Sequence, residues 1–482
     1  MLIRLFTLAS LLAATPGIAQ DHDAMGHMDH GDMAAQMDQA PAPAPTPEPD
    51  RPHDGHGASS PSEPMHDMGA MEGPSAAISR MTAPSGVACP PSAPGEIVID
   101  CNRVPAFSEA SGTSRLPAMG GAMSGLHVMT GGWMLMAHGY AQLAYTDHKG
   151  PRGDDLIYST SMLMLTGQRD TDWGRIQLRS MLSLEPTMAP RGYPNLFATG
   201  ETADGKPIVD RQHPHDLFME LAGRLDVNIG SEASLFLYGG PVGEPALGPA
   251  AFIHRGSARY NPEPPITHHW FDSTHITYGV VTAGLATRTW QIEGSIFRGR
   301  EPDEDRWDIE TPSLDSWSVR LSWSPSPNWS AQLSHGFIKQ PEALHPGENE
   351  KRTVASLHFS GGSGLSAMAA FSAKKRDPGD TLTAWLVEAN YDLAAHHALF
   401  GRIENVANDE LVPDHADPLH DKPFRITKAQ AGYAWHTPIG SGPVELTLGG
   451  SINIYGKPQA LDVLYGANPW GYTLFARLSL GR

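Results

Sequence analysis

Residues 131–482 alternate apolar and polar side chains in one segment after another, and this pattern constrains the fold more than any other feature. In the segment GRIQLRSMLSLE at 174–185, Ile176, Leu178 and Leu182 fall on one face, while Arg175 and Arg179 fall on the other. A period of two is that of a β-strand whose two faces meet different environments. Strands with this pattern are expected at 133–145, 156–166, 174–185, 217–229, 275–283, 317–323, 383–391, 401–405 and 472–480. In the segment 217–229, Met219 and Leu221 fall on the apolar face.

Soluble β-sandwiches and membrane β-barrels both show this alternation, but three properties favour the barrel. The segments run to about 9–12 residues, which suits a tilted strand that crosses a bilayer, whereas most strands in soluble proteins have about five or six. Trp and Tyr lie near the segment ends, as in the aromatic girdles of membrane barrels. Short turns such as 324–328 alternate with long loops at 186–214 and 240–273. The sequence therefore predicts an all-β fold, an antiparallel transmembrane β-barrel of about 14–16 strands.

The first residues predict export. Arg4, an apolar run from Leu5 to Ala14 and the small residue Ala19 fit a secretory signal peptide over residues 1–19. Together with the barrel, this signal predicts a location in the outer membrane, with membrane lipid as a partner and the N-terminal segment in the periplasm. The 53 acidic residues against 34 basic residues argue against nucleic acid as a partner.

Composition divides the rest of the chain into three zones. Residues 20–82 are rich in Met, His and Pro and poor in aromatic residues, so they cannot bury enough apolar surface to offset their conformational entropy and are expected to be disordered. Residues 83–130 form a transition segment, and residues 131–482 form the barrel. Cys89 and Cys101 lie in the transition segment and are expected to form a disulfide in an oxidising compartment, with a thiolate metal site as the alternative.

A Met/His tract, which comprises DHDAMGHMDHGDMAAQM at 21–37 and MHDMGAM at 65–71, points to a metal. Thioether sulfur is a soft ligand that selects Cu(I), and imidazole binds both Cu(I) and Cu(II). Copper is therefore the predicted cofactor, with periplasmic copper-handling proteins as partners. Zinc or nickel bound by the histidines alone, and a linker that binds no metal, are the alternatives. The predicted ligands are His22, Met25, His27, Met28, His30, Met33, Met37, Met65, His66, Met68 and Met71.

The start of the tract offers a second kind of copper site. Cleavage after Ala19 would leave a chain that begins Gln20-Asp21-His22. A free amine, two backbone amides and the third-position imidazole can form the square-planar site that Cu(II) or Ni(II) prefers. Cyclisation of Gln20, or cleavage one residue later, would destroy this site.

Histidines and carboxylates also gather in the loops of the barrel, in DRQHPHDLFMEL at 210–221, in residues 243–275 and in FRGREPDEDRWD at 297–308, which adds Glu301 and Glu304. Because these loops flank neighbouring strands, their side chains are expected to meet at one mouth of the barrel. The gathering is either a network that holds the loops against the wall or a polar or metal site. Its members are His213, His215, Asp216, His254, His268, His269, Asp272 and His275.

The signal peptide, the MGHMDHGDM segment and the C-terminal barrel together resemble the outer-membrane copper-resistance proteins of Gram-negative bacteria, such as the copper-resistance protein B family. The segments RQHPHD, GEPALGP, HHWFDSTH and GREPDEDRWD resemble instead an uncharacterised outer-membrane family that accompanies metal-resistance genes. The resemblance implies copper tolerance at the cell envelope.

Three functions follow as hypotheses. The first is an outer-membrane protein that sequesters copper through the Met/His tract. The second is a general porin-like channel whose tract is incidental. The third is a membrane-embedded hydrolase with a Ser/His pair such as Ser273 and His275, but no GxSxG, HExxH or phosphate-loop motif is present in the sequence. The chain is therefore expected not to be an enzyme.

Overall fold

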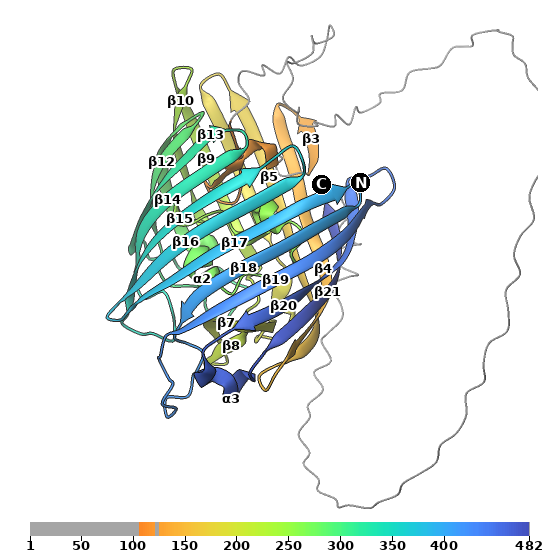
Figure 1. The fold of residues 1–482 in the computed structure, drawn as a ribbon. Coiled ribbons are helices and arrows are strands. Elements are labelled where there is room, and N and C mark those ends of the chain that lie inside the picture. Colours follow the sequence, from red (N-terminus) through yellow and green to blue (C-terminus); the bar gives the residue numbers. More distant parts are fainter. Residues whose placement is uncertain (1–105, 121–124, 482) are drawn as a thin grey trace, which may run out of the picture. The chain divides into compact units, whose positions relative to one another are not determined.

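The computed structural model describes residues 106–120 and 125–481, and within them the chain forms a closed antiparallel β-barrel (Figure 1). Sixteen strands make up the wall, which confirms the predicted fold class. The short strand β3 (Leu126–Thr130) pairs with the start of β4, and the last strand, β21, pairs with the remainder of β4 and closes the ring.

The sixteen wall strands are long, as expected for a membrane barrel. They are β4 (Trp133–Lys149), β5 (Asp155–Thr171), β6 (Gly174–Leu182), β9 (Phe218–Ile229), β10 (Ala233–Gly243), β11 (Thr277–Thr287), β12 (Trp290–Phe297), β13 (Ser316–Ser326), β14 (Trp329–Ile338), β15 (Asn349–Ser360), β16 (Leu365–Asp377), β17 (Thr381–Ala394), β18 (His397–Asn408), β19 (Phe424–Pro438), β20 (Val444–Gly456) and β21 (Trp470–Leu480).

The connections differ sharply between the two ends of the barrel. At the turn end, where β4 begins and β21 ends, short turns such as 172–173 and 288–289 join the strands. At the loop end the connections include 183–217, 244–276 and 298–315. Bacterial outer-membrane barrels have short periplasmic turns and long extracellular loops. In the described part of the chain, no helix is long and apolar enough to cross a membrane.

The outer surface carries the apolar face of the predicted alternation. Leu178, Leu321 and Ile452 are exposed in mid-strand, whereas their neighbours in sequence point inward. Aromatic side chains mark both rims: Trp290 stacks on Trp323 near the turn end, and other exposed tryptophans lie near the loop end. An apolar band between aromatic girdles is the surface that lipid requires.

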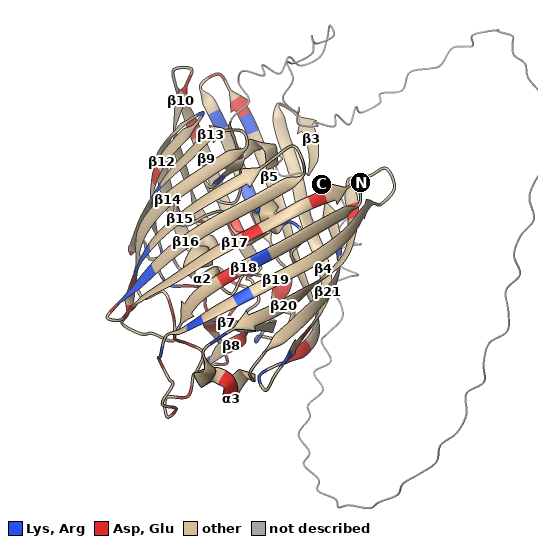
Figure 2. Ribbon diagram, in the orientation of Figure 1, with Lys and Arg blue, Asp and Glu red and all other residues tan. Residues whose placement is uncertain are grey.

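The lumen side of the wall is polar and charged, and buried ions there are paired. Arg402 donates to Glu388 at 2.9 Å, Arg320 donates to Glu293 at 2.9 Å, and all four side chains are buried. Figure 2 shows the charged residues as isolated blue and red segments in strands that are otherwise tan. Paired charges satisfy one another where water is scarce, so they can line a filled lumen.

Segments of the chain itself occupy the lumen. The hairpin of β1 (Phe107–Glu109) and β2 (Arg115–Pro117) lies among the strands near the turn end, where Arg320 donates to Ser114 Oγ at 3.0 Å. Loop 244–276 fills the middle: its Glu263 accepts hydrogen bonds from Lys428 at 2.8 Å and from Asn453 at 2.9 Å. The barrel is therefore plugged rather than empty.

Two local features depart from the sequence expectation. The long loop expected at 186–214 contains its own hairpin, β7 (Tyr193–Ala203) and β8 (Lys206–Gln212), most of whose first strand is buried. Met219, expected on the apolar outer face with Leu221, is buried instead. The pairing of β6 with β9 shifts at this point, because Met181 pairs with Glu220 while Leu182 pairs with Phe218.

Candidate metal centre in the lumen

Five histidines from two loops meet inside the barrel, and we call them the histidine centre. The segment after β8 supplies the first two, and loop 244–276 supplies the other three. All five side chains are buried. The members are His213, His215, His268, His269 and His275.

Local sequence explains how these side chains are presented. Pro214 restricts the backbone between His213 and His215, whose ring centroids lie 6.3 Å apart. The short helix α2 (His268–Phe271) places His268 and His269 side by side, with ring centroids 5.3 Å apart. The backbone N–H of Thr267 donates to Glu404 Oε2 at 3.0 Å and ties the start of this helix to the barrel wall.

Gly200 is required where the β7 hairpin passes the centre. Its φ is +105°, and a Cβ atom at this position would lie 2.4 Å from Cε1 of His269. Any side chain would therefore displace the imidazole, so the glycine leaves the space that the His269 ring occupies.

An oxygen atom faces Nδ1 of each ring in the histidine centre. His268 and His215 lie 2.9 Å from Asp272 and from Glu185, and His275 lies 2.7 Å from the carbonyl of Asp272. For His269 the oxygen is Glu301 Oε1 at 3.3 Å, and His213 faces both the carbonyl of Pro214 at 3.2 Å and Glu201 Oε1 at 3.3 Å. Oxygen partners on one ring nitrogen orient a histidine so that the other nitrogen can bind a metal.

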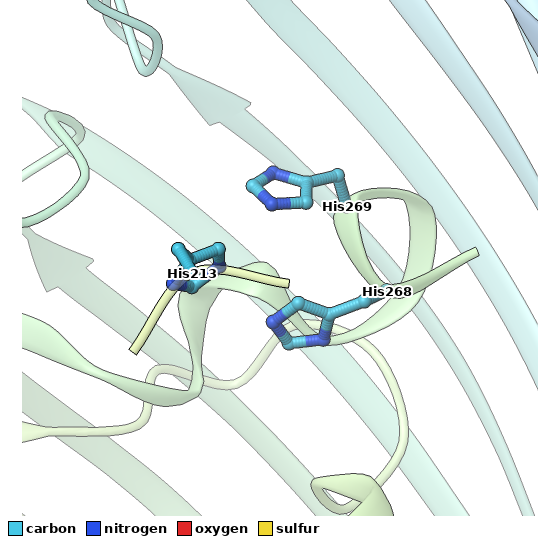
Figure 3. Close-up of side chains that lie close together, drawn as sticks. All are labelled: His213, His268 and His269. Carbon is cyan, nitrogen blue, oxygen red and sulfur yellow. The ribbon is translucent and has the colours of Figure 1, made fainter. Parts of the chain in front are cut away.

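Most of the nitrogens left without a hydrogen bond are the opposite ones. Nε2 of His213, His215, His269 and His275 is buried and has no hydrogen-bond partner among the described residues, and Nδ1 of His269 has none besides its ion-pair contact with Glu301. His213, His268 and His269 each offer a ring nitrogen within 4.8 Å of the others, and Figure 3 shows their three rings turned toward a common space. Buried polar atoms without partners are costly, and a bound cation would satisfy them.

Burial keeps three members of the centre in the neutral form that binds metals. It holds the pKa of His213 and of His275 well below the ordinary value. Arg306 acts in the same direction on the pKa of His213, whereas Asp272 opposes the effect of burial on His275. Burial also lowers the pKa of His268, although Asp272 partly opposes it. Metal ligation requires unprotonated imidazole, so these three rings need lose no proton on binding.

Two members behave differently because their carboxylate partners outweigh the effect of burial. Burial alone would lower the pKa of His269, but Glu301 outweighs it and raises the pKa to about 9. Glu185 likewise raises the pKa of His215 against the effect of burial. A metal bound by His269 must therefore displace a proton at neutral pH.

A second group of potential ligands is already neutralised. Glu342, His345 and Glu410 offer atoms within 4.8 Å of one another. However, Lys374 lies 2.7 Å from Glu342, and Arg376 pairs with Glu410. Because these cations take up the carboxylate charge, the histidine centre is the better metal candidate.

The structure brings together most of the loop residues singled out in the sequence, but not all in one place. Asp272 contacts His268 and also pairs with Arg255 at 3.1 Å. Asp216 is buried 3.7 Å from Arg306. His254 lies apart from the five rings and contacts Met181 and His138. The predicted ligands between His22 and Met71, and the cysteines Cys89 and Cys101, lie outside the described residues.

Comparison with known proteins gives only weak matches. No family model matches the chain, and no curated protein matches it. Similar solved structures include OmpF of Salmonella typhi in complex with daunomycin, at 7% identity over 73% of this chain and 99% of that chain, with a TM-score of 0.47. OprB of Pseudomonas putida at high pH matches at 11% identity over 73% and 94%, with a TM-score of 0.46. The outer membrane channel DcaP of Acinetobacter baumannii matches at 12% identity over 73% and 98%, with a TM-score of 0.43.

Similarities this weak do not bear on function, and the barrel itself rests on the strand pairing described above. The same pairing shows what sequence reasoning missed in the lumen. Met181 falls on the same face of β6 as the inward-facing Arg175 and Arg179. A methionine on this otherwise polar face was the signal in the sequence that could have indicated its place in the lumen. The plugging hairpin at 107–117 left no comparable signal, because its strands have only three residues each.

The serine and histidine pairs do not form a catalytic arrangement. Ser273 Oγ accepts a hydrogen bond from Arg352 at 3.0 Å, while His275 faces the carbonyl of Asp272. Ser356 Oγ does lie 3.4 Å from His358 Nε2, but no carboxylate in the described part of the chain is hydrogen-bonded to that ring. A catalytic base needs such a third group to orient it.

Proposed function

We propose that this chain is an outer-membrane metal-binding protein whose plugged barrel holds a divalent transition metal at His213, His268 and His269. The observation that carries the proposal is the arrangement of the rings: each faces an oxygen through Nδ1, and a nitrogen of each lies within 4.8 Å of the other two. Three imidazoles with carboxylates behind them form the ligand set of many zinc and copper sites.

Copper is the metal that suits both the histidine centre and the Met/His tract. Among divalent first-row ions, copper binds nitrogen ligands most strongly. The Met/His tract at 21–71 offers many soft ligands, and it would capture copper in the same protein. The outer-membrane location and the sequestration of periplasmic copper belong to this proposal, as do copper-handling partners.

The test is a Cu(II) titration of the full chain against a competing chelator of known affinity. The double variant His213→Asn, His269→Asn is expected to bind one Cu(II) ion fewer than the natural chain. His148→Asn is the matched control, because His148 is equally buried in the lumen but lies outside the histidine centre. Equal Cu(II) binding by all three chains would refute the proposal.

Removing residues 21–82 separates the tract from the barrel. The shortened chain is expected to keep one Cu(II) ion at the histidine centre and to lose the remaining copper. If the shortened chain keeps all of its copper, the tract does not sequester the metal. If it keeps none, the barrel has no metal site.

A porin-like channel is the second candidate, and the barrel fold itself favours it. A cavity of about 210 Å³ runs among residues that include Ser479 and Leu480 at the turn end and His215 deeper in the lumen. The two proposals differ in whether the plug blocks the passage of ions through the barrel. A channel predicts steady ion conductance of the natural chain in a planar lipid bilayer, whereas a plugged metal-binding barrel predicts little.

A further inference from the structure

A separate group of soft donor atoms lines the lumen wall on β4, β5 and β6. His138 lies directly opposite Met164 in the pairing of β4 with β5, and Met164 lies opposite Met181 in the pairing of β5 with β6. All three side chains point into the lumen, and both methionines are fully buried. The three residues therefore form one row across adjacent strands.

His254 completes this row from loop 244–276. Its Nε2 atom lies 3.3 Å from Sδ of Met181, and its ring centroid lies 5.8 Å from that of His138. Nδ1 of His138 is buried and has no hydrogen-bond partner among the described residues. Met162 and Met219 pack beside the row and extend its sulfur-rich surface.

Packing alone does not account for this arrangement. Methionine fills irregular gaps in hydrophobic cores, and that property explains why the sulfurs are buried against Ile276 and Tyr278. It does not explain why two imidazoles face them. A buried ring nitrogen without a partner is costly, and leucine or phenylalanine would fill the same volume without that cost.

The donor set selects a particular class of ion. Two thioethers and two neutral imidazoles carry no charge, and thioether sulfur prefers soft monovalent ions such as Cu(I). A divalent ion would leave two positive charges in the lumen, whereas a monovalent ion leaves one. Burial holds the pKa of His254 well below its ordinary value, so this ring is unprotonated at neutral pH.

We propose that His138, Met164, Met181 and His254 bind one soft monovalent cation, Cu(I), at a site distinct from the histidine centre. The cavity of about 210 Å³ is lined by His138, Met162 and His254 and also by Ser479 and Leu480 near the turn end. The cavity therefore extends from residues near the turn end to the two histidines of the row. The site does not depend on the metal proposed for the histidine centre.

Ag(I) is the probe for this site, because it has the charge and softness of Cu(I) and does not change oxidation state in air. The full-length chain and the variant Met164→Leu, Met181→Leu are titrated with Ag(I) against a competing ligand. Leucine nearly conserves the volume of methionine, so the fold is expected to survive. The variant is expected to bind one Ag(I) ion fewer than the natural chain.

Met368→Leu is the matched control, because Met368 is also buried and faces the lumen but lies on β16, far around the barrel. It is expected to leave Ag(I) binding unchanged. Equal Ag(I) stoichiometry and affinity in all three chains would overturn the proposal. An equal loss in the control would also overturn it, because the effect would then not be local.

Two further measurements keep the test specific. Zn(II) binding at the histidine centre is expected to be the same in the natural chain and in the Met164→Leu, Met181→Leu variant. If Zn(II) binding falls together with Ag(I) binding, the two sites are not separate and the proposal fails. In crystals grown with Ag(I), an anomalous peak between Met181 Sδ and His254 Nε2 is expected, and its absence from an otherwise silver-bound chain contradicts the site.

Discussion

Replacing Glu301 by glutamine should change how metal binding at the histidine centre depends on pH. Glu301 faces Nδ1 of His269 at 3.3 Å and raises the pKa of that imidazole to about 9. Below this pKa the ring is protonated before metal arrives, so binding releases one proton. The affinity of the natural chain should therefore rise about tenfold for each pH unit between 7 and 9, since one unit corresponds to about 1.4 kcal/mol.

In the variant Glu301→Gln the pKa of His269 should fall, because Glu342 is then the carboxylate that opposes burial. The affinity should then rise less steeply with pH between 7 and 9. Loss of an orienting carboxylate also weakens a metal site by about 10- to 100-fold. At pH 9 this loss should be seen in full, whereas at pH 7 the weaker proton competition should offset part of it.

The assay is a Zn(II) competition titration at several pH values between 6.5 and 9, in a chain that lacks residues 21–82 so that the tract does not bind the probe. Glu304→Gln is the control, because Glu304 lies in the same loop but contacts Thr202. It should keep the slope of the natural chain. The reasoning is refuted if the natural chain shows no slope between pH 7 and 9, or if Glu301→Gln shows the same slope.

Three further predictions concern the barrel and its plug. Deleting residues 106–120 should raise ion conductance in planar bilayers, because the β1–β2 hairpin then leaves the lumen; unchanged conductance would show that the hairpin blocks nothing. Leu321→Arg should lower the free energy of unfolding in lipid vesicles by about 2–4 kcal/mol, since Leu321 faces lipid in mid-strand, whereas Leu314→Arg in a loop should have little effect. Lys428→Met should lower the free energy of unfolding in urea by about 3–5 kcal/mol, because it leaves the buried carboxylate of Glu263 without its cation. The double variant Lys428→Met, Glu263→Gln should recover part of this loss.

Much of the barrel was predictable because alternation is a property of each strand by itself. The inward and outward faces of β6 follow directly from GRIQLRSML, and the aromatic rims follow from Trp and Tyr at strand ends. Met219 was placed on the wrong face because a register shift in the β6–β9 pairing interrupts the alternation. Such a shift depends on the partner strand, so the local sequence does not reveal it.

The candidate site was predictable only in part. The clustering of His213, His268 and His269 could be anticipated, because two unusual loops flank neighbouring strands. Their orientation could not, since Glu185 and Glu301 come from separate parts of the chain and reach the rings only after the loops fold into the lumen. The assignment of His254 to a separate row likewise depends on a contact with β6 that three-dimensional packing creates.

The most direct measurement of the central claim is a zinc anomalous difference map from crystals of the full-length chain grown with Zn(II). The account predicts one peak inside the barrel at bonding distance, about 2.0–2.1 Å, from a ring nitrogen of each of His213, His268 and His269. A chain that binds Zn(II) in solution but shows no peak among these three rings would contradict it.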